Sequence, residues 1–144
     1  MAADDDALRD LIRAAGLRVT RARLTVMRLL SHVEGPVSHA EVNASLTGDG
    51  WDRATLYRNL IALTDAGLLR RVDVGDHVWR FERVPESGHA HAEHHPHFLC
   101  TACGDVACLP ELAIQAPASA VPRALAAGQV SIQLRGLCDE CIAI

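Results

Sequence analysis

Four of the five cysteines in this chain form two Cys-x-x-Cys pairs: Cys100, Cys103, Cys138 and Cys141. Two residues between thiolates allow both sulfurs to reach one zinc ion at about 2.3 Å, and two such pairs complete a closed tetrahedron. Because a closed site has no open position for water or substrate, we expect structural zinc. Four unrelated buried cysteines are a weaker alternative. A thioredoxin-like redox motif is weaker still, since no βαβ pattern surrounds either pair.

A second set of potential metal ligands flanks the first cysteine pair: Glu82, His95, His97 and Cys108. Pro96 favours an extended backbone, on which the imidazoles of His95 and His97 can face one ion. Cys108 lies in the segment DVACL, which we expect to form a strand that returns from a turn at Gly104. With the sulfur the set matches a four-ligand zinc site, whereas without it iron or manganese would fit better. The alternative for Cys108 is a small buried side chain that binds no metal.

Three further histidines, His89, His91 and His94, lie in ESGHAHAEHH, a stretch typical of a solvated loop. The sequence leaves open whether one of them, or His77 or His39, joins the second ligand set. The fragment HAE followed by CTAC is faintly similar to a zinc deaminase pattern, but it lacks a Pro-Cys pair and leaves the second cysteine pair without a purpose. We therefore expect no enzyme, no catalytic residue and no small-molecule substrate.

Helices are expected upstream of these ligands, where apolar residues recur at helical spacing. The spacing and the start and stop signals predict helices over residues 7–16, 21–33, 39–46 and 53–71. The side chains of Thr20, Ser38 and Asp52 are the expected N-caps of the last three.

The last of these helices has two different faces when its residues are projected at 100° each. Leu56, Leu60 and Leu63 share one face, which we expect to pack on the preceding helices. The opposite face, which we expect to point outward, contains Ala54, Tyr57, Arg58 and Ile61. An ordinary amphipathic surface helix would show the same division, so this pattern alone assigns no function.

The segment LLRRVDVGDHVWRF predicts two strands joined by a two-residue turn at Gly75-Asp76. Three helices followed directly by a hairpin are typical of a winged helix-turn-helix, whose last helix enters the major groove of DNA. We therefore expect double-stranded DNA as a partner, with protein docking as the alternative use of such a module. The candidate contacts to phosphates and bases are Arg18, Arg21, Arg23, Arg53, Thr55, Tyr57 and Arg58.

Charge is divided unevenly between the two halves of the chain. All 14 basic residues are arginines, and 12 of them lie in residues 1–83 together with 12 acids, whereas residues 84–144 contain two arginines and six acids. This division is typical of a protein with one nucleic-acid-facing module, although the net charge of −4 argues weakly against that partner. No apolar run approaches the roughly 20 residues that span a bilayer. The acidic start is unlike a secretory signal, so we expect a cytoplasmic protein without membrane contact.

A winged helix containing ATLYRNL, a glutamate that closes the wing, and HHPHFLCTACG followed by CDEC together resemble the ferric uptake regulator family. The resemblance implies a homodimeric, metal-dependent transcription factor, normally a repressor, that binds a palindromic operator. It implies an α+β fold with an N-terminal winged helix-turn-helix over residues 1–83, a hinge over 84–95, and a small C-terminal α/β dimerisation domain with a zinc knuckle over 96–144. The segment QVSIQLRGL would join a sheet across the dimer.

The same resemblance implies roles for single residues. It places Arg18 and Arg23 near phosphates, and Tyr57 and Arg58 on the recognition helix. The four paired cysteines match the structural zinc site of the family. The ligands of its regulatory site, which bridges the two domains, are matched by Glu82, His95 and His97.

Some positions depart from the pattern of the iron-sensing members. Cys108 stands where many of them have a glutamate, and Pro96, Gln115 and Val130 stand where further ligands are expected. These departures favour the zinc uptake regulator branch, with zinc as the second, regulatory metal. A member that responds to iron, manganese or peroxide is the alternative within the family. A zinc buffering or delivery protein without DNA binding is an alternative of another class, but it leaves the winged helix unexplained.

Overall fold

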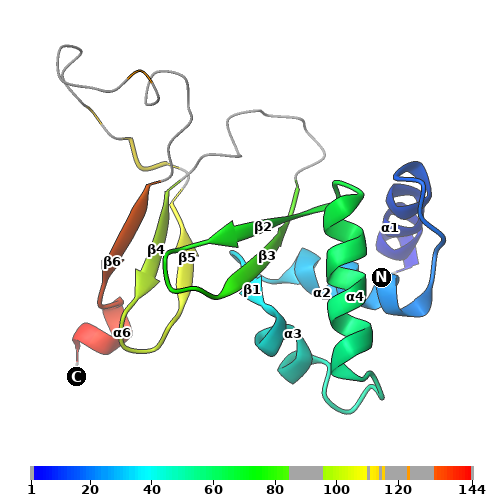
Figure 1. The fold of residues 1–144 in the computed structure, drawn as a ribbon, viewed down its shortest axis with the longest axis horizontal. Coiled ribbons are helices and arrows are strands. Elements are labelled where there is room, and N and C mark those ends of the chain that lie inside the picture. Colours follow the sequence, from blue (N-terminus) through cyan, green and yellow to red (C-terminus); the bar gives the residue numbers. More distant parts are fainter. Residues whose placement is uncertain are drawn as a thin grey trace. The chain divides into compact units, whose positions relative to one another are not determined.

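The computed structural model describes residues 2–84, 96–109, 111–113, 115, 123 and 132–143. The chain divides into a first unit, Met1–Val84, and a second unit, Pro85–Ile144. Figure 1 shows helices and a small sheet in the first unit, and strands followed by a short helix in the second. The predicted α+β class, with an N-terminal helical unit and a C-terminal α/β unit, is confirmed.

The first unit contains the helices and the wing of a winged helix-turn-helix. Its elements are α1 (Ala2–Ala14), α2 (Arg21–His32), β1 (Val37–Ser38), α3 (His39–Ser45), α4 (Arg53–Asp65), β2 (Leu69–Asp73) and β3 (Trp79–Arg83). The sheet has the strand order β1-β3-β2, and both strand pairs are antiparallel. Strand β1 was not predicted, because two residues are too few to show the alternation of a strand.

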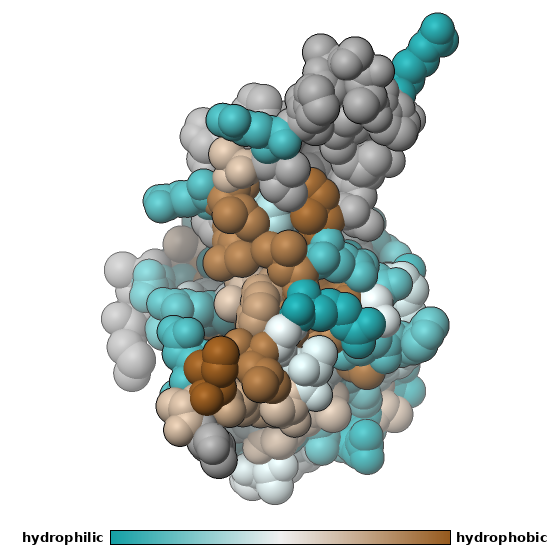
Figure 2. Space-filling view, turned by 90° about the vertical axis from the view of Figure 1, so that its left-hand side faces the viewer, coloured by the Kyte–Doolittle hydropathy of each residue, from teal (hydrophilic) through white to brown (hydrophobic). Residues whose placement is uncertain are grey.

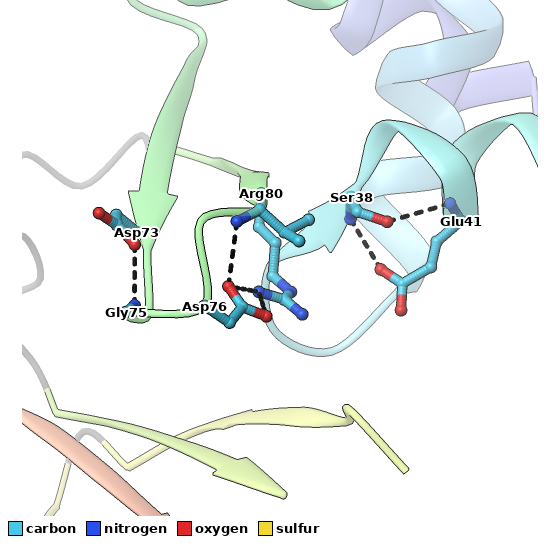
Figure 3. Close-up of polar contacts among 7 residues, drawn as sticks. Ser38, Glu41, Asp73, Gly75, Asp76 and Arg80 are labelled. Atoms are coloured by element: carbon cyan, nitrogen blue, oxygen red, sulfur yellow. Dashed lines mark hydrogen bonds and ion pairs between the residues drawn. The ribbon is translucent and has the colours of Figure 1, made fainter. Parts of the chain in front are cut away.

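All three predicted N-caps are confirmed. The side chains of Thr20 and Asp52 each accept a hydrogen bond from the backbone N–H three residues further on, at 3.3 and 2.9 Å. Ser38 and Glu41 form a capping box at the start of α3. The hydroxyl of Ser38 accepts from the Glu41 N–H at 3.1 Å, and the Glu41 carboxylate accepts from the Ser38 N–H at 2.7 Å (Figure 3).

The core of the first unit joins its helices to the wing. The inner face predicted for α4 is confirmed, because Leu56, Leu60 and Leu63 are fully buried beside apolar side chains of α1, α2 and β3. Burial of each such leucine stabilises the fold by roughly 1.5–3 kcal/mol. The outward placement predicted for Ile61 is wrong, since this side chain is half-buried against the same core. Helix α4 also packs on β2, so its buried stripe is wider than the three leucines.

Helix α4 ends at Asp65, several residues before the predicted end at residue 71. The cause is Gly67, whose φ of 82° is a left-handed conformation that glycine adopts without strain. The Gly67 N–H donates to the Thr64 carbonyl at 3.0 Å, and the Leu68 N–H donates to the Leu63 carbonyl at 3.0 Å. The chain then enters β2.

The two-residue turn predicted for the wing is wrong, because residues 74–78 join β2 to β3. Two aspartates stabilise this longer loop (Figure 3). The carboxylate of Asp73 accepts a hydrogen bond from the Gly75 N–H at 2.8 Å, and Asp76 forms an ion pair with Arg80 at 2.8 Å. A side-chain bond to a nearby backbone group, such as that of Asp73, offers the backbone an alternative to a tight hairpin turn.

The second unit contains β4 (His97–Cys100), β5 (Val106–Cys108), β6 (Gln133–Gly136) and α6 (Asp139–Ile142). The strand order is β5-β4-β6, with β5 antiparallel and β6 parallel to β4. The strand predicted for DVACL is therefore confirmed, as is a strand within QVSIQLRGL. Over the whole described part of the chain, no helix has the length and apolarity needed to cross a lipid bilayer.

Candidate metal centres and nucleic-acid interface

The two cysteine pairs are brought together by the pairing of β4 with β6. Cys100 ends β4 and lies opposite Gly136, and Cys138 follows two residues later as the first residue before α6. The turn between the first two cysteines closes with a hydrogen bond from the Gly104 N–H to the Cys100 carbonyl at 3.0 Å. The Thr101 N–H donates to the Gly136 carbonyl at 2.8 Å, which ties this turn to the end of β6.

The four sulfur atoms have the spacing that a zinc ion requires. The Sγ atoms of Cys100, Cys103, Cys138 and Cys141 all lie within 4.8 Å of one another. Those of Cys103 and Cys138 are 3.8 Å apart. A tetrahedron with zinc–sulfur bonds of about 2.3 Å has edges of roughly 3.8 Å. The residues present therefore fit a structural zinc ion, and four soft sulfur donors exclude a magnesium or calcium site.

The electrostatics of the cluster also suit a cation. Backbone N–H groups of Cys103 and Cys138 donate to the Cys100 sulfur and lower the pKa of this thiol to about 6. The neighbouring sulfur atoms, that of Cys138 foremost, raise the pKa of Cys141 to about 12. One thiolate is thus favoured by the backbone, while full ionisation of the cluster requires a positive charge at its centre.

The second predicted ligand set is partly assembled within the second unit. His97 on β4 and Cys108 on β5 are direct cross-strand partners, and their ligand atoms lie within 4.8 Å of each other. Cross-strand partners point to the same face of a sheet, so both side chains can reach one ion. Cys108 is half-buried rather than fully enclosed, which is less typical of a purely apolar role.

Glu82 belongs to the first unit, where it lies opposite Arg70 across the wing. One of its carboxylate oxygens accepts hydrogen bonds from the Arg70 guanidinium at 2.6 Å. His95 lies outside the described residues, as do His89, His91 and His94. The participation of Glu82 and His95 in one site with His97 and Cys108 stays a prediction. Of the other histidines considered, His77 lies in the wing loop with a φ of 61°.

Four of the predicted DNA contacts lie in the first two turns of α4. The side chains of Arg53, Tyr57 and Arg58 are exposed, and 46% of the Tyr57 surface is accessible. Thr55 is engaged with the N-cap, because its hydroxyl donates to the Asp52 carboxylate at 2.5 Å. This bond lowers the pKa of Asp52. Arg58 in turn donates to the Thr55 hydroxyl at 3.2 Å, so both side chains would have to change partners to contact a base.

The other three predicted contacts surround the start of α2. Arg18 and Arg21 are exposed, whereas Arg23 is half-buried and donates to the Arg18 carbonyl at 2.7 Å. The guanidinium of Arg21 lies 5.4 Å from the ring centre of Trp51, the residue two positions before α4. This cation–π contact brings the start of α2 beside the start of α4. The two groups of arginines therefore belong to one part of the first unit.

Sequence reasoning missed two contacts made by these site residues. The first is the contact between Arg70 and Glu82. It depends on the strand register of the wing, because no short sequence motif links residues 12 positions apart. His39 contacts Tyr57, with ring centres 5.3 Å apart, and its Nε2 atom lies 2.9 Å from the Arg53 carbonyl oxygen. The expected helix boundaries place His39 at the start of a helix, which alone does not indicate a neighbour on the next helix.

The sequence model of the Ferric uptake regulator family matches residues 14–135 of the chain. Ferric uptake regulation protein 1 of Mycolicibacterium fortuitum is 34% identical over 99 residues, which are 67% of this chain and 57% of that protein. The chain thus spans just over half of that relative. The ferric uptake regulation protein of Neisseria meningitidis serogroup A is 27% identical over 137 residues, with 90% of each protein covered.

Solved structures of related regulators have the same fold. The Vibrio cholerae ferric uptake regulator is 25% identical with a TM-score of 0.66, and the match covers 90% of this chain and 98% of that one. A zinc-bound manganese uptake regulator is 25% identical with a TM-score of 0.67, covering 91% and 98%. A zinc uptake regulator in complex with zinc and DNA is 22% identical with a TM-score of 0.59, covering 96% and 93%.

Proposed function

We propose that this chain, which belongs to the ferric uptake regulator family, is a zinc-responsive repressor that binds a palindromic DNA operator as a homodimer. Membership of the family makes it a metal-responsive, DNA-binding transcriptional regulator and not an enzyme. The identity of the sensed metal, the repressor role and the residues that act are the parts that we propose.

The observation that supports zinc is the pairing of His97 with Cys108 across β4 and β5. A thiolate and an imidazole are soft and borderline donors, which zinc prefers, whereas manganese and iron sites of this kind rely on oxygen and nitrogen. We propose that Glu82 and His95 complete the regulatory set. Arg70 would hold the Glu82 carboxylate in one orientation, so that the wing presents a ready oxygen ligand.

The four-cysteine cluster has a separate role in this proposal. Its sulfur atoms leave no coordination position for water or for a ligand from elsewhere. The zinc that they fit would hold the ends of β4 and β6 together and would stabilise the second unit. Small units with few large apolar side chains commonly need such a metal.

If, as we propose, the regulatory site takes Glu82 from the first unit and His97 and Cys108 from the second, metal binding would act as a simple switch. When bound, the ion supplies one positive centre for ligands of both units. Ligation by both units would restrict their relative motion and so select the spacing at which the two α4 helices of a dimer match successive major grooves. A coupling of about 1–3 kcal/mol, or roughly 5–150-fold in DNA affinity, is the usual scale for such linkage.

Strand β6 supports the proposed dimer. It lies at the edge of the described three-stranded sheet, where its outer backbone groups can pair with a second copy. Apolar side chains gather on the face of the molecule that Figure 2 draws. Leu137, just after the strand, is 47% exposed, and Ile142 in α6 is 69% exposed. Burial of exposed apolar side chains is the main driving force for association.

DNA affinity with and without zinc tests the proposal. The probe is a duplex selected from a randomised pool by the zinc-loaded wild-type protein, and the readout is fluorescence anisotropy. For the wild type, zinc should raise the affinity by roughly 5–150-fold over the chelated protein. Cys108→Ser should abolish this gain. Ala107→Ser is the matched control, because Ala107 faces the opposite side of the same strand and should leave the gain intact.

Three other results would contradict parts of the proposal. Equal DNA affinities with and without zinc, for the wild type and both variants, would show that the protein is not a zinc sensor. A gain with manganese or ferrous iron but not with zinc would identify a different member of the family. Zinc binding without any salt-sensitive affinity for a duplex would favour a buffering or delivery protein.

A further inference from the structure

His39 connects the start of α3 to the recognition helix through two separate contacts. Its ring lies 5.3 Å from the Tyr57 ring, centre to centre, with a tilt of 58° between the planes. Its Nε2 atom lies 2.9 Å from the carbonyl oxygen of Arg53, the first residue of α4. A carbonyl only accepts hydrogen bonds, so Nε2 carries the proton in this contact.

The backbone that carries His39 is held from two sides. The preceding residue, Ser38, caps α3 through its reciprocal bonds with Glu41. Ser38 also pairs with Arg80 in the ladder between β1 and β3, and Arg80 forms an ion pair with Asp76 in the wing loop. Figure 3 shows Ser38 and Glu41 at the start of α3, beside the strand that carries Arg80. His39 therefore directly follows a residue that is held both by the α3 capping box and by the β1–β3 ladder.

Tyr57 needs such a support because it is otherwise poorly restrained. Nearly half of its surface is accessible, at 46%, and it lies on the outer side of α4. A tyrosine in solvent samples several rotamers, and each rotamer lost on binding reduces the net affinity for DNA. A tilted aromatic neighbour at 5.3 Å favours one ring position before DNA arrives.

We propose that His39 is a positioning residue for DNA recognition: it orients the Tyr57 ring and the first turn of α4, and thereby sets discrimination at the base pair that Tyr57 contacts. This inference rests on the proposed function, since it needs Tyr57 to contact DNA. Discrimination at a single base depends on geometry, whereas phosphate contacts supply affinity without sequence preference. Loss of His39 should therefore reduce base discrimination at one position in each half-site. It should have a smaller effect on the overall affinity for DNA.

The two contacts can be separated by substitution. His39→Phe keeps an aromatic ring beside Tyr57 but removes the donor to the Arg53 carbonyl. His39→Gln keeps a donor of similar reach and removes the ring, and His39→Ala removes both. The matched control is His32→Ala, because a ring nitrogen of His32 also lies against a backbone carbonyl, that of Arg28 at 2.7 Å, but at the end of α2.

The experiment uses the full-length, zinc-loaded protein and the duplex selected by the wild type, together with duplexes changed at one base pair at a time. For His39→Ala, the ratio of affinities for the selected and the changed duplex should fall about 5–10-fold at one position per half-site. Its affinity for an unrelated duplex should stay within roughly 2-fold of the wild type. His39→Phe should retain more of the ratio than His39→Gln, and His32→Ala should retain all of it.

A double-mutant cycle distinguishes positioning from a general structural role. In a Tyr57→Ala background, His39→Ala should cause no further loss of discrimination, because the ring that it positions is gone. A uniform loss at every position, or an undiminished effect in the Tyr57→Ala background, would overturn the inference. Unchanged discrimination in His39→Ala would overturn it as well while leaving the proposed function intact. If the wild type itself selects no duplex, the proposed function fails first.

Discussion

His97 and Cys108 lie directly opposite each other on the antiparallel strands β4 and β5, and their ligand atoms are within 4.8 Å. The hydrogen-bonded ladder sets this separation, so the pair needs no chain rearrangement to ligate one ion. A rigid pair of this kind restricts the choice of metal through the chemistry of its donors.

Replacement of the sulfur donor should change the metal preference. In Cys108→Asp, an oxygen takes the place of the thiolate, and the ratio of zinc to manganese affinity should fall by about tenfold or more. Competition titrations with a chromogenic zinc chelator measure this ratio. Ala107→Asp on the same strand controls for the added charge, and an equal fall in that variant would mean that Cys108 is not a ligand.

Loss of the four-cysteine cluster should have a different outcome from loss of the second site. Cys138→Ser should remove one zinc ion per chain and unfold the second unit, because structural zinc contributes about 10 kcal/mol or more to the folding of small domains. Metal analysis should show the lower zinc content, and analytical ultracentrifugation should show a monomer. Cys108→Ser should also lose one zinc ion yet remain dimeric, and a dimeric Cys138→Ser protein with full zinc content would contradict the separation of roles.

The inner and outer faces of α4 should respond differently to truncation. Leu60→Ala leaves a cavity in the core and should lower the free energy of unfolding by about 2–5 kcal/mol. Tyr57→Ala on the outer face should change it by less than about 1 kcal/mol but should weaken operator binding. Urea unfolding and anisotropy titrations on the same two proteins measure both quantities. A stable Leu60→Ala protein would mean that the core can collapse around the vacancy.

The ion pair between α1 and α2 should make stability depend on pH. The Arg28 guanidinium donates two hydrogen bonds to the Asp5 carboxylate, from Nε at 3.0 Å and from Nη2 at 2.7 Å. These bonds lower the pKa of Asp5 below its ordinary value of 3.8. The stabilisation is therefore present above pH 3.8 and is lost as the pH falls through the lowered pKa of the folded state. The difference in unfolding free energy between wild type and Asp5→Asn should disappear under those acidic conditions.

Asp6→Asn is the control for this pH dependence, because Asp6 is an exposed aspartate of the same helix. It should show a smaller difference at neutral pH. A difference for Asp5→Asn that persists unchanged at low pH would mean that the substitution acts through something other than the ion pair.

Features that depend on neighbours along the chain could be predicted. The caps at Thr20, Ser38 and Asp52 were correct because each side chain binds the backbone only three residues further on. The leucine face of α4 followed from helical periodicity. The two Cys-x-x-Cys pairs indicated a shared zinc site because the chemistry of four thiolates leaves few alternatives.

Features that depend on strand register and packing could not be predicted. The wing loop is an exception among the local features: the Gly75-Asp76 pair indicated a two-residue turn, but Asp73 and Asp76 stabilise a longer loop through bonds to residues two and four positions further on. Ile61 is half-buried against the core, and helix α4 also contacts β2, neither of which helical periodicity indicates. The sequence indicated His97 and Cys108 as candidate ligands but did not show that they lie opposite each other on neighbouring strands.

By itself, therefore, the sequence determined the order of the main helices and of the wing strands, the helix N-caps, the family resemblance and the list of candidate ligands. Only the tertiary structure decided that His97 faces Cys108, that Arg70 holds Glu82, and that His39 supports Tyr57. The physical reason is that local hydrogen bonds and side-chain periodicity act over a few residues. Contacts between distant residues depend on the one arrangement of strands and helices that buries the whole apolar core.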